Sequence, residues 1–319
     1  MKQTKFAFSL FLCFSLLFII AEKSFAGDKV TLKLNLKKGD VFHYNMTTFQ
    51  NISQSIKKQD INIKQTMTFG YLMEVKNIDA DGSYVIDATY DKIKISMNSM
   101  GSDENYDSED TTATLSKTGK IYSCLKGATL GIVLTSSGKV TKVTGINKLI
   151  DKMIASMGIK DESMEKTMRT SLQSMVGEET MKQSFGNGFD IYPDGPVSVG
   201  STWTKEMNMK IISSMTIKND YRVTEIKDNL VNIDVKSTIS TDPGAKGIEM
   251  MGMTMNYKLK GTQKGNSEME ISSGMVTKST ITQDISGTVS MSGLSDDGKD
   301  NTWPISILST ITITTDKRK

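Results

Sequence analysis

The fold is decided by the stretch "NIDADGSYVIDATYDKIKISM", residues Asn77–Met97. Its opening, Asn77–Tyr84, is rich in Asp and Gly, which is a strong signal for a β-hairpin turn. Tyr84–Met97 then alternates apolar and polar residues, as a half-buried strand does. A strand of about 14 residues spans roughly 45 Å. Strands this long twist and coil, so they predict a strongly curved antiparallel sheet or half-barrel.

The residues before this hairpin continue the β pattern. Val30–Leu36 alternates strictly and is predicted as a strand, followed by strands at Val41–Ile56 and Ile61–Val75. After the hairpin, the acidic segment Gly101–Thr112 is predicted as an exposed loop. A short hairpin is then expected over residues 129–143.

The apolar period changes to that of helices near residue 146. Ile146–Met157 carries apolar residues at helical spacing and is followed by Gly158, which suits a helix C-cap. A second helix is expected to begin at Asp161 or Ser163 and to end near Gly177. A third short helix is expected over Glu178–Ser184.

The remainder of the chain returns to alternating patterns. Gly186–Trp203 is predicted as a loop. The strands expected after it are Trp203–Lys218, Tyr221–Ile226, Val231–Ile239, Met251–Lys260, Glu268–Ser272, Met275–Ser290 and Pro304–Thr314. We therefore expect a mainly β (β+α) protein: one domain over residues 27–319, with an inserted helical pair at about 146–184.

The N-terminus has the pattern of a secretory signal peptide, residues 1–26. Lys2 and Lys5 precede the apolar run Phe6–Ala21, and Ser24–Ala26 has the small residues of a cleavage site. We expect export to the periplasm or cell envelope of a Gram-negative-type bacterium, with no integral membrane span after cleavage. Removing three Lys and one Glu lowers the net charge from +3 to about +1. A nearly neutral chain without a basic block argues against nucleic acid as a partner.

No residue set in the sequence has the composition and spacing of a catalytic or cofactor site. His43 is the only histidine, so neither a metal triad nor a Ser–His–Asp system is expected. A nucleophilic Cys124 would need a histidine partner, and His43 is the only one in the chain. Asp107 and Glu109 lie in a hydrophilic stretch that offers nothing to raise a carboxyl pKa. We expect a protein that is not an enzyme and has no cofactor and no dedicated metal site.

Several of these segments together resemble a functionally uncharacterised family of secreted, β-rich bacterial proteins. They are "LKLNLKKGDVFHY" (Leu32–Tyr44), "DADGSYVIDATYDKIKI" (Asp79–Ile95), "SGKVTKVTGINKLI" (Ser137–Ile150), "YPDGPVSVGSTW" (Tyr192–Trp203) and the "GTQKG…ISSGMV" pattern near residues 261–276. The architecture of this family looks similar to the half-barrels of periplasmic lipoprotein carriers. The resemblance implies a curved antiparallel sheet partly closed by helices, and it brings no functional residues with it.

Methionine is unusually frequent, with 22 in the chain. In "GIEMMGMTMNYKLKG" (Gly247–Gly261), strand alternation puts Met251, Met253 and Met255 on one face, predicted to turn toward the interior. These residues fit a packed core, an apolar pocket for a lipid or lipoprotein acyl chain, or Cu(I) binding through thioethers. The candidate pocket residues are Met153, Met157, Met164, Met168, Met175, Met251, Met253 and Met255. A structure without an apolar cavity above roughly 300 Å³ favours a structural or surface interaction protein with a filled core.

Overall fold

The computed structural model describes residues 29–112, 114–210, 213–250, 253–292 and 301–318. Within these ranges thirteen strands form one sheet. They are β1 Val41–Ile56, β2 Gln59–Ile78, β3 Tyr84–Ser99, β4 Ser102–Asp107, β5 Thr129–Leu134, β6 Val140–Thr144, β7 Thr202–Lys210, β8 Ser214–Lys227, β9 Leu230–Thr241, β10 Ile248–Met250, β11 Met253–Glu270, β12 Val276–Ser292 and β13 Asn301–Arg318.

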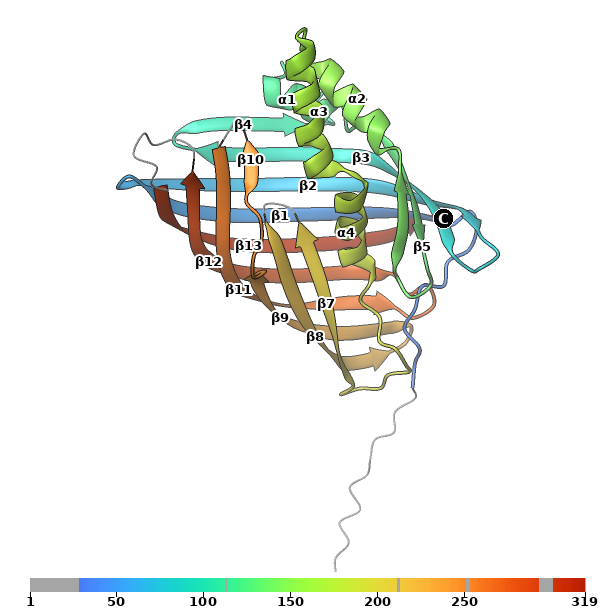
Figure 1. The fold of residues 1–319 in the computed structure, drawn as a ribbon. Coiled ribbons are helices and arrows are strands. Elements are labelled where there is room, and N and C mark those ends of the chain that lie inside the picture. Colours follow the sequence, from blue (N-terminus) through green and yellow to red (C-terminus); the bar gives the residue numbers. More distant parts are fainter. Residues whose placement is uncertain (1–28, 113, 211–212, 251–252, 293–300, 319) are drawn as a thin grey trace, which may run out of the picture.

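The strand order is β6-β5-β3-β2-β1-β13-β12-β11-β9-β8-β7, with β4 paired to β3 and β10 to β11. All of these pairings are antiparallel. β6 and β7 are the two edges of this path, so the sheet curves without closing, and its hollow side faces the helices (Figure 1). The predicted curved antiparallel sheet is confirmed.

Glycines on the hollow side let two central strands bend tightly. Gly265 on β11 and Gly287 on β12 alternate onto the same face as Leu259, which is buried. A Cβ at Gly265 would meet the Thr280 carbonyl oxygen at 2.1 Å, and one at Gly287 would meet that of Lys258 at 2.0 Å. Only glycine allows the backbones to approach this closely, which is how strongly coiled strands accommodate their curvature.

Four helices are present in the described residues: α1 Lys117–Ser123, α2 Ile146–Met157, α3 Glu162–Val176 and α4 Glu178–Phe189. The predicted helix ends are confirmed, because Gly158 closes α2 with a φ of 64° and the Asp161 side chain caps α3 by accepting from the amide of Met164 at 2.8 Å. α1 was not predicted, and α4 extends past Ser184 into the expected loop. None of the described helices is long and apolar enough to cross a membrane.

Helix α4 joins the two edges of the sheet. It contacts β6 on one side and β7 on the other, and it lies in front of the hollow face (Figure 1). Its C-terminal end also meets the β5–β6 turn, where Gly138 lies against the Phe189 carbonyl group. We call α4 the strap, because it spans the open side of the curved sheet.

The prediction of a strand at Val30–Leu36 is wrong. This segment forms an isolated bridge between Val30 and Val197 and no ladder with another described strand. Further along, the Leu34 amide donates to the loop carbonyl of Ser136. Leu32, Leu34 and Leu36 are nevertheless buried, so the alternation was real. The segment is extended and crosses the ends of hairpins instead of pairing along a strand.

Three further boundaries differ from the predictions. The acidic segment Gly101–Thr112 is not a loop throughout, because it contains β4. One of the acids of β4, Asp107, pairs with Lys94 of β3 at 3.1 Å. The expected strand Trp203–Lys218 is the hairpin of β7 and β8. The two strands expected near Met251–Lys260 and Glu268–Ser272 are one long strand, β11. The predicted signal peptide, 1–26, lies outside the described residues.

The apolar interior forms two separate cores on the hollow side of the sheet. The larger core lies under the helices and includes Ile86, Ile132, Ile150 and Val223. The smaller core lies at the other end of the long strands and contains Met215, Ile217, Ile239, Leu259, Ile285, Val289, Trp303 and Ile305. The residues between these two cores define the candidate site.

Candidate functional site

A transverse row of polar side chains divides the two cores. Pairing across seven neighbouring strands brings one polar residue from each strand into a single line. We call this row the polar belt; in strand order it consists of Gln65, Gln50, Ser309, Gln283, Gln263, Ser237 and Asn219. On β8 the division is plain, since Ile217 belongs to the smaller core and Tyr221 to the larger one, with Asn219 between them.

The belt is joined by hydrogen bonds along most of its length. Gln65 donates to Gln50, and Gln50 donates to Ser309 at 3.2 Å. Gln283 donates to the Gln263 carbonyl oxygen at 2.9 Å. A buried polar group costs about 1–3 kcal/mol when it lacks a partner, so mutual bonding is what makes a polar row tolerable there.

At the end of the belt, one amide is fixed in orientation. The Asn219 carbonyl oxygen accepts from Ser237 Oγ at 2.6 Å and from Gln263 Nε2 at 3.0 Å. Both interactions require the oxygen of Asn219 to face the belt, so its NH₂ group must point away from these donors. Asn219 is 2 % exposed.

A cavity of about 120 Å³ lies beside Asn219, between the sheet and the C-terminal end of the strap. Its walls come from β1, β7, β8, β9, β11, β12, β13 and α4, together with Ile191. They include the aliphatic side chains Ile233, Val235, Ile281 and Ile313 and the aromatic side chains Tyr44, Trp203 and Tyr221. None of the described residues that line it is charged. The cavity is therefore a largely apolar space whose polar lining groups are the end of the belt, Asn187, Ser267, Ser279 and the tyrosine hydroxyls.

The segment that follows the strap is fastened over this cavity. Trp203 Nε1 donates to the Ile191 carbonyl at 2.8 Å, and the Trp203 ring stacks on Tyr221 with centroids 5.1 Å apart and planes 14° apart. The buried Tyr192 hydroxyl donates to the Gly274 carbonyl at 2.8 Å. These contacts hold the segment that follows the strap against the sheet. The partners of Trp203 could not be identified from the sequence without the fold.

Two tyrosines of the cavity have hydroxyl groups that bond to no other described residue. Burial raises the pKa of Tyr44 to about 12. Burial, and to a smaller extent the Asp190 carboxylate, raises the pKa of Tyr221, which is 7 % exposed. Both phenols are therefore neutral at physiological pH and available as hydrogen-bond donors.

The candidate methionines whose side chains are described do not converge on one place. Met153, Met157 and Met168 contact the larger core, whereas Met255 contacts the smaller core beyond the belt. Met164 is 59 % exposed. Met251 lies outside the described residues, and for Met175 and Met253 only the backbone element is described. Met255 is half-buried against the smaller core and so faces the interior, but a different part of it from the helical methionines. None of the candidate methionines whose side chains are described lines the apolar cavity.

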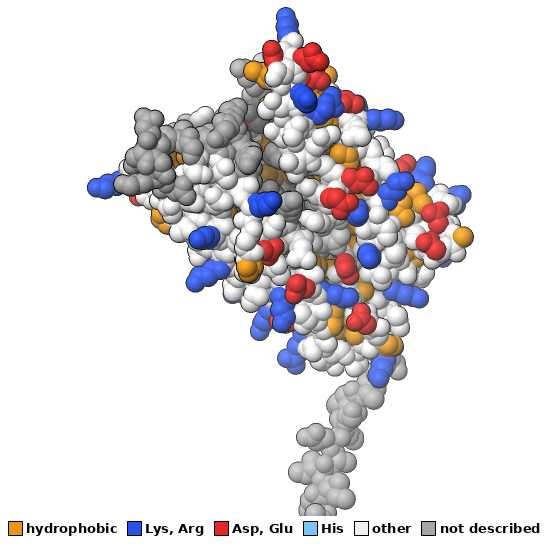
Figure 2. Space-filling model, viewed as in Figure 1, with side chains coloured by type: hydrophobic (Ala, Val, Ile, Leu, Met, Phe, Trp, Pro, Cys, Tyr) orange, Lys and Arg blue, Asp and Glu red, His pale blue; other side chains and the backbone are white. Residues whose placement is uncertain are grey.

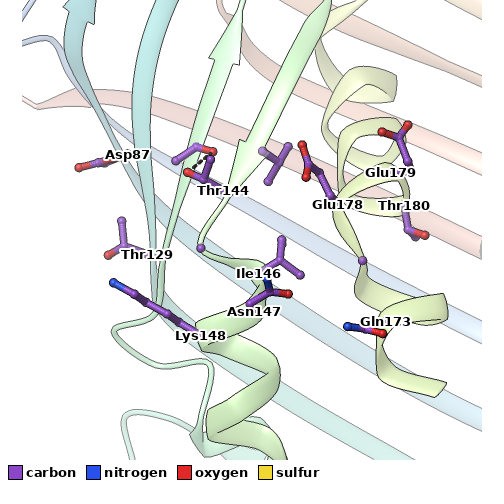
Figure 3. A pocket seen from close by; sticks show the side chains of 14 residues that line it. Asp87, Thr129, Thr144, Ile146, Asn147, Lys148, Gln173, Glu178, Glu179 and Thr180 are labelled. Carbon is purple, nitrogen blue, oxygen red and sulfur yellow. Dashed lines mark hydrogen bonds between the residues drawn. The ribbon is translucent and has the colours of Figure 1, made fainter. Parts of the chain in front are cut away.

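The larger hollows of the molecule have walls that mix polar, charged and apolar side chains. One of about 890 Å³ lies between the start of α2 and the junction of α3 with α4, and Figure 3 shows Lys148, Glu178 and Glu179 at its walls. Another, of about 540 Å³, surrounds His43, which pairs with Asp91 at 2.5 Å. In the described part of the chain, no three His, Cys, Asp or Glu side chains form a group that fits a metal ion. On the face in Figure 2, cationic and anionic side chains are interspersed.

Residues 81–276 match the model of a family of unknown function (DUF6263). No curated protein matches the chain. Among solved structures, the chain is similar to one described as "lipid-protein interactions in lipovitellin", with a TM-score of 0.45 and 10% identity over 88% of this chain and 25% of that chain. This protein thus spans about a quarter of the lipovitellin chain.

Two Pseudomonas aeruginosa proteins are similar over most of both chains, but with low TM-scores. OccK5 (OpdH) has a TM-score of 0.22 and 6% identity over 88% of this chain and 99% of that chain. OpdQ has a TM-score of 0.20 and 9% identity over 89% of this chain and 100% of that chain. The family match extends over more than half of the sequence, which confirms the predicted resemblance to an uncharacterised family: the chain belongs to the family of unknown function DUF6263.

Proposed function

We propose that this protein is an exported, non-enzymatic binder of an apolar ligand, a lipid or an acyl chain, held between the curved sheet and the strap. The observation that carries this proposal is the cavity at the junction of the strap and the hollow face, where no lining residue that the structure describes is charged. Ligand sites are typically concave and apolar, with a few placed polar groups, and this cavity has that composition.

The size of the cavity implies that the strap moves when ligand enters. A volume of about 120 Å³ holds only about four groups of water or methylene size. A drug-sized or lipid ligand needs at least about 300 Å³. The strap forms part of the wall, through Asn187 and Gly188, and is therefore the element whose displacement enlarges the space.

Two glycines of the strap allow a matched test. Gly188 lines the cavity and is exposed, so it lies at its mouth, whereas Gly186 does not line it. A Cβ at either position meets no atom within 4 Å. Gly188→Phe should fill the mouth and weaken binding of the fluorescent apolar probe N-phenyl-1-naphthylamine by tenfold or more. Gly186→Phe, the control, should leave binding unchanged.

Probe binding that is absent from the wild-type protein would sink the proposal. So would native mass spectrometry of protein purified from cell envelopes, if the chain carried no adduct and bound no probe. Export is tested separately, by fusing residues 1–26 to alkaline phosphatase; activity of the fusion requires translocation to the periplasm. A fusion without activity would exclude this route.

A structural or surface interaction protein is the second candidate. The small volume of the apolar cavity favours it, because 120 Å³ is below the roughly 300 Å³ typical of ligand sites. The two functions differ in the Gly188→Phe result. A filled-core protein keeps its surface interactions and, having bound no probe before the substitution, shows no change after it.

A further inference from the structure

The polar groups at the border of the cavity carry information about the ligand. Three side chains on this border end in donor groups that have no acceptor among the described residues: the Asn219 NH₂ group and the Tyr44 and Tyr221 hydroxyls. Asn219 and Tyr221 are both more than nine-tenths buried. Buried donors in native proteins are nearly always paired, so donors that line a cavity without a protein acceptor indicate that an acceptor in a ligand binds there.

The orientation of Asn219 leaves no acceptor at this residue for a hydrogen-bond donor of the ligand. Its carbonyl oxygen is already used twice, by Ser237 and by Gln263. The next donor along the belt, Gln263 Nε2, is also used twice, by the Asn219 oxygen and by Ser237 Oγ at 2.8 Å. The belt therefore offers the cavity a free NH₂ group and no free carbonyl at Asn219, which selects an acceptor in the ligand.

The acceptor must also be uncharged. Among the described residues, the lining contains no Lys, Arg or His that would neutralise a carboxylate or a phosphate. An ion placed in an apolar site without a partner of opposite charge loses several kcal/mol of solvation. The tyrosine phenols supply no positive charge in either protonation state, because they are neutral when protonated and anionic when deprotonated.

We propose that the cavity takes the uncharged carbonyl group of an acyl ester or amide, with its oxygen accepting from Asn219 and from the tyrosine hydroxyls, and its chain packed on Ile233, Val235 and Ile281. This inference rests on the proposed binding of an apolar ligand and specifies the chemistry of that ligand. It also gives the end of the polar belt a role, since the neighbouring belt residues hold the Asn219 amide in the donating orientation.

Displacement of N-phenyl-1-naphthylamine by three small competitors of similar size tests the proposal at pH 7.5. Ethyl benzoate carries an uncharged ester, butylbenzene carries no acceptor, and benzoate carries a charge. One hydrogen bond without a charged partner corresponds to about a five- to tenfold change in affinity. We expect ethyl benzoate to displace the probe at a five- to tenfold lower concentration than butylbenzene, and benzoate to displace it least.

Variants assign the selectivity to residues. Asn219→Leu should remove the advantage of the ester over butylbenzene. Because this change also leaves Ser237 and Gln263 without their acceptor, Tyr221→Phe provides a milder test that keeps the ring stacked on Trp203. It should reduce the advantage two- to fivefold. Tyr257→Phe, in a tyrosine that packs against the smaller core and does not line the cavity, is the matched control and should leave the advantage intact.

The outcomes separate this inference from the proposed function. If butylbenzene displaces the probe as well as ethyl benzoate does, or if benzoate is the best competitor, the carbonyl assignment is wrong and apolar binding stands. Equal ester selectivity in the wild-type protein, Asn219→Leu and Tyr221→Phe also overturns it. If the wild-type protein binds no probe and no ester, both proposals fail.

Discussion

Replacing Gly138 with Ala tests whether the strap is held by the β5–β6 turn. Gly138 has a φ of +86°, in the left-handed region that disfavours side chains. A Cβ there would lie 1.9 Å from the Phe189 carbonyl oxygen, at the end of the strap, and 2.9 Å from Tyr192 Cε2. The substitution therefore combines backbone strain with a collision against the strap.

The two contributions can be estimated separately. A left-handed conformation costs a residue with a side chain about 1–2 kcal/mol. To reach an ordinary contact distance, the Phe189 carbonyl must withdraw by about 1.5 Å, and overpacking of this kind costs about 1–3 kcal/mol. We expect Gly138→Ala to lower the free energy of unfolding by about 2–5 kcal/mol in total.

Gly39→Ala is the control for the strain alone. Gly39 also has a φ of +86°, yet nothing lies within 4 Å of the Cβ that would be added. Urea unfolding followed by circular dichroism should show a loss of about 1–2 kcal/mol for this variant. Hydrogen exchange adds a local measurement: amides of α4 should exchange faster in Gly138→Ala and at the wild-type rate in Gly39→Ala.

Equal losses of stability in the two variants, with unchanged exchange in α4, would refute the reasoning. That result would mean that the strap does not depend on its contact with the β5–β6 turn. The wall of the cavity would then have to be held by Trp203 and Tyr192 alone.

Three other perturbations have defined outcomes. Met269→Ala, at a fully buried position, should cost about 2–5 kcal/mol in urea unfolding, whereas Met164→Ala at the exposed end of α3 should change stability by less than about 0.5 kcal/mol. Burial raises the pKa of Tyr44 from 10.0 to about 12, so the stability that its neutral phenol contributes is complete below pH 10 and is lost as the pH rises toward 12. In urea unfolding at alkaline pH, Tyr44→Phe should therefore show a smaller loss of stability with rising pH. Partial burial raises the pKa of Asp40, but its ion pair with Lys317 at 2.7 Å helps to bring the net pKa below 3.8. The stability that the Asp40 carboxylate contributes is therefore present above pH 3.8 and lost below it. Lys317→Gln should make this acid-induced loss smaller, and an unchanged acid titration would contradict the role of the pair.

Local patterns were sufficient for most of the architecture. Alternation in Tyr84–Met97 and the turn before it predicted a long strand after a hairpin, and β3 occupies Tyr84–Ser99. The change of period at Ile146 predicted helices, because the spacing of apolar residues depends only on neighbouring positions in the chain. These features are determined within about twenty residues, so one sequence is enough to find them.

Features that depend on distant partners were not predictable in the same way. Val30–Leu36 alternates as a strand does, but whether it pairs with another strand depends on where the hairpin ends near Ser136 and Ser273 lie. The acidic residues of β4 disfavour a strand locally, and the pairing of Asp107 with Lys94 of β3 is recognisable only once the two strands are in register. The predicted loop before Trp203 failed in its first part because α4 continues until the β5–β6 turn stops it.

The polar belt shows why the candidate site was missed. Within a single strand, Gln50 or Gln263 is one polar residue on an otherwise apolar face, and it only interrupts the alternation of apolar and polar residues. Register converts these interruptions into one continuous row, and the row ends at an amide whose oxygen is occupied and whose nitrogen is free. Methionine is frequent in the sequence, but the methionines whose side chains are described contribute chiefly to packing. Their number alone did not indicate a binding site. The chemistry of the cavity is instead specified by Asn219, which only the pairing of seven strands distinguishes from any other polar residue in a strand.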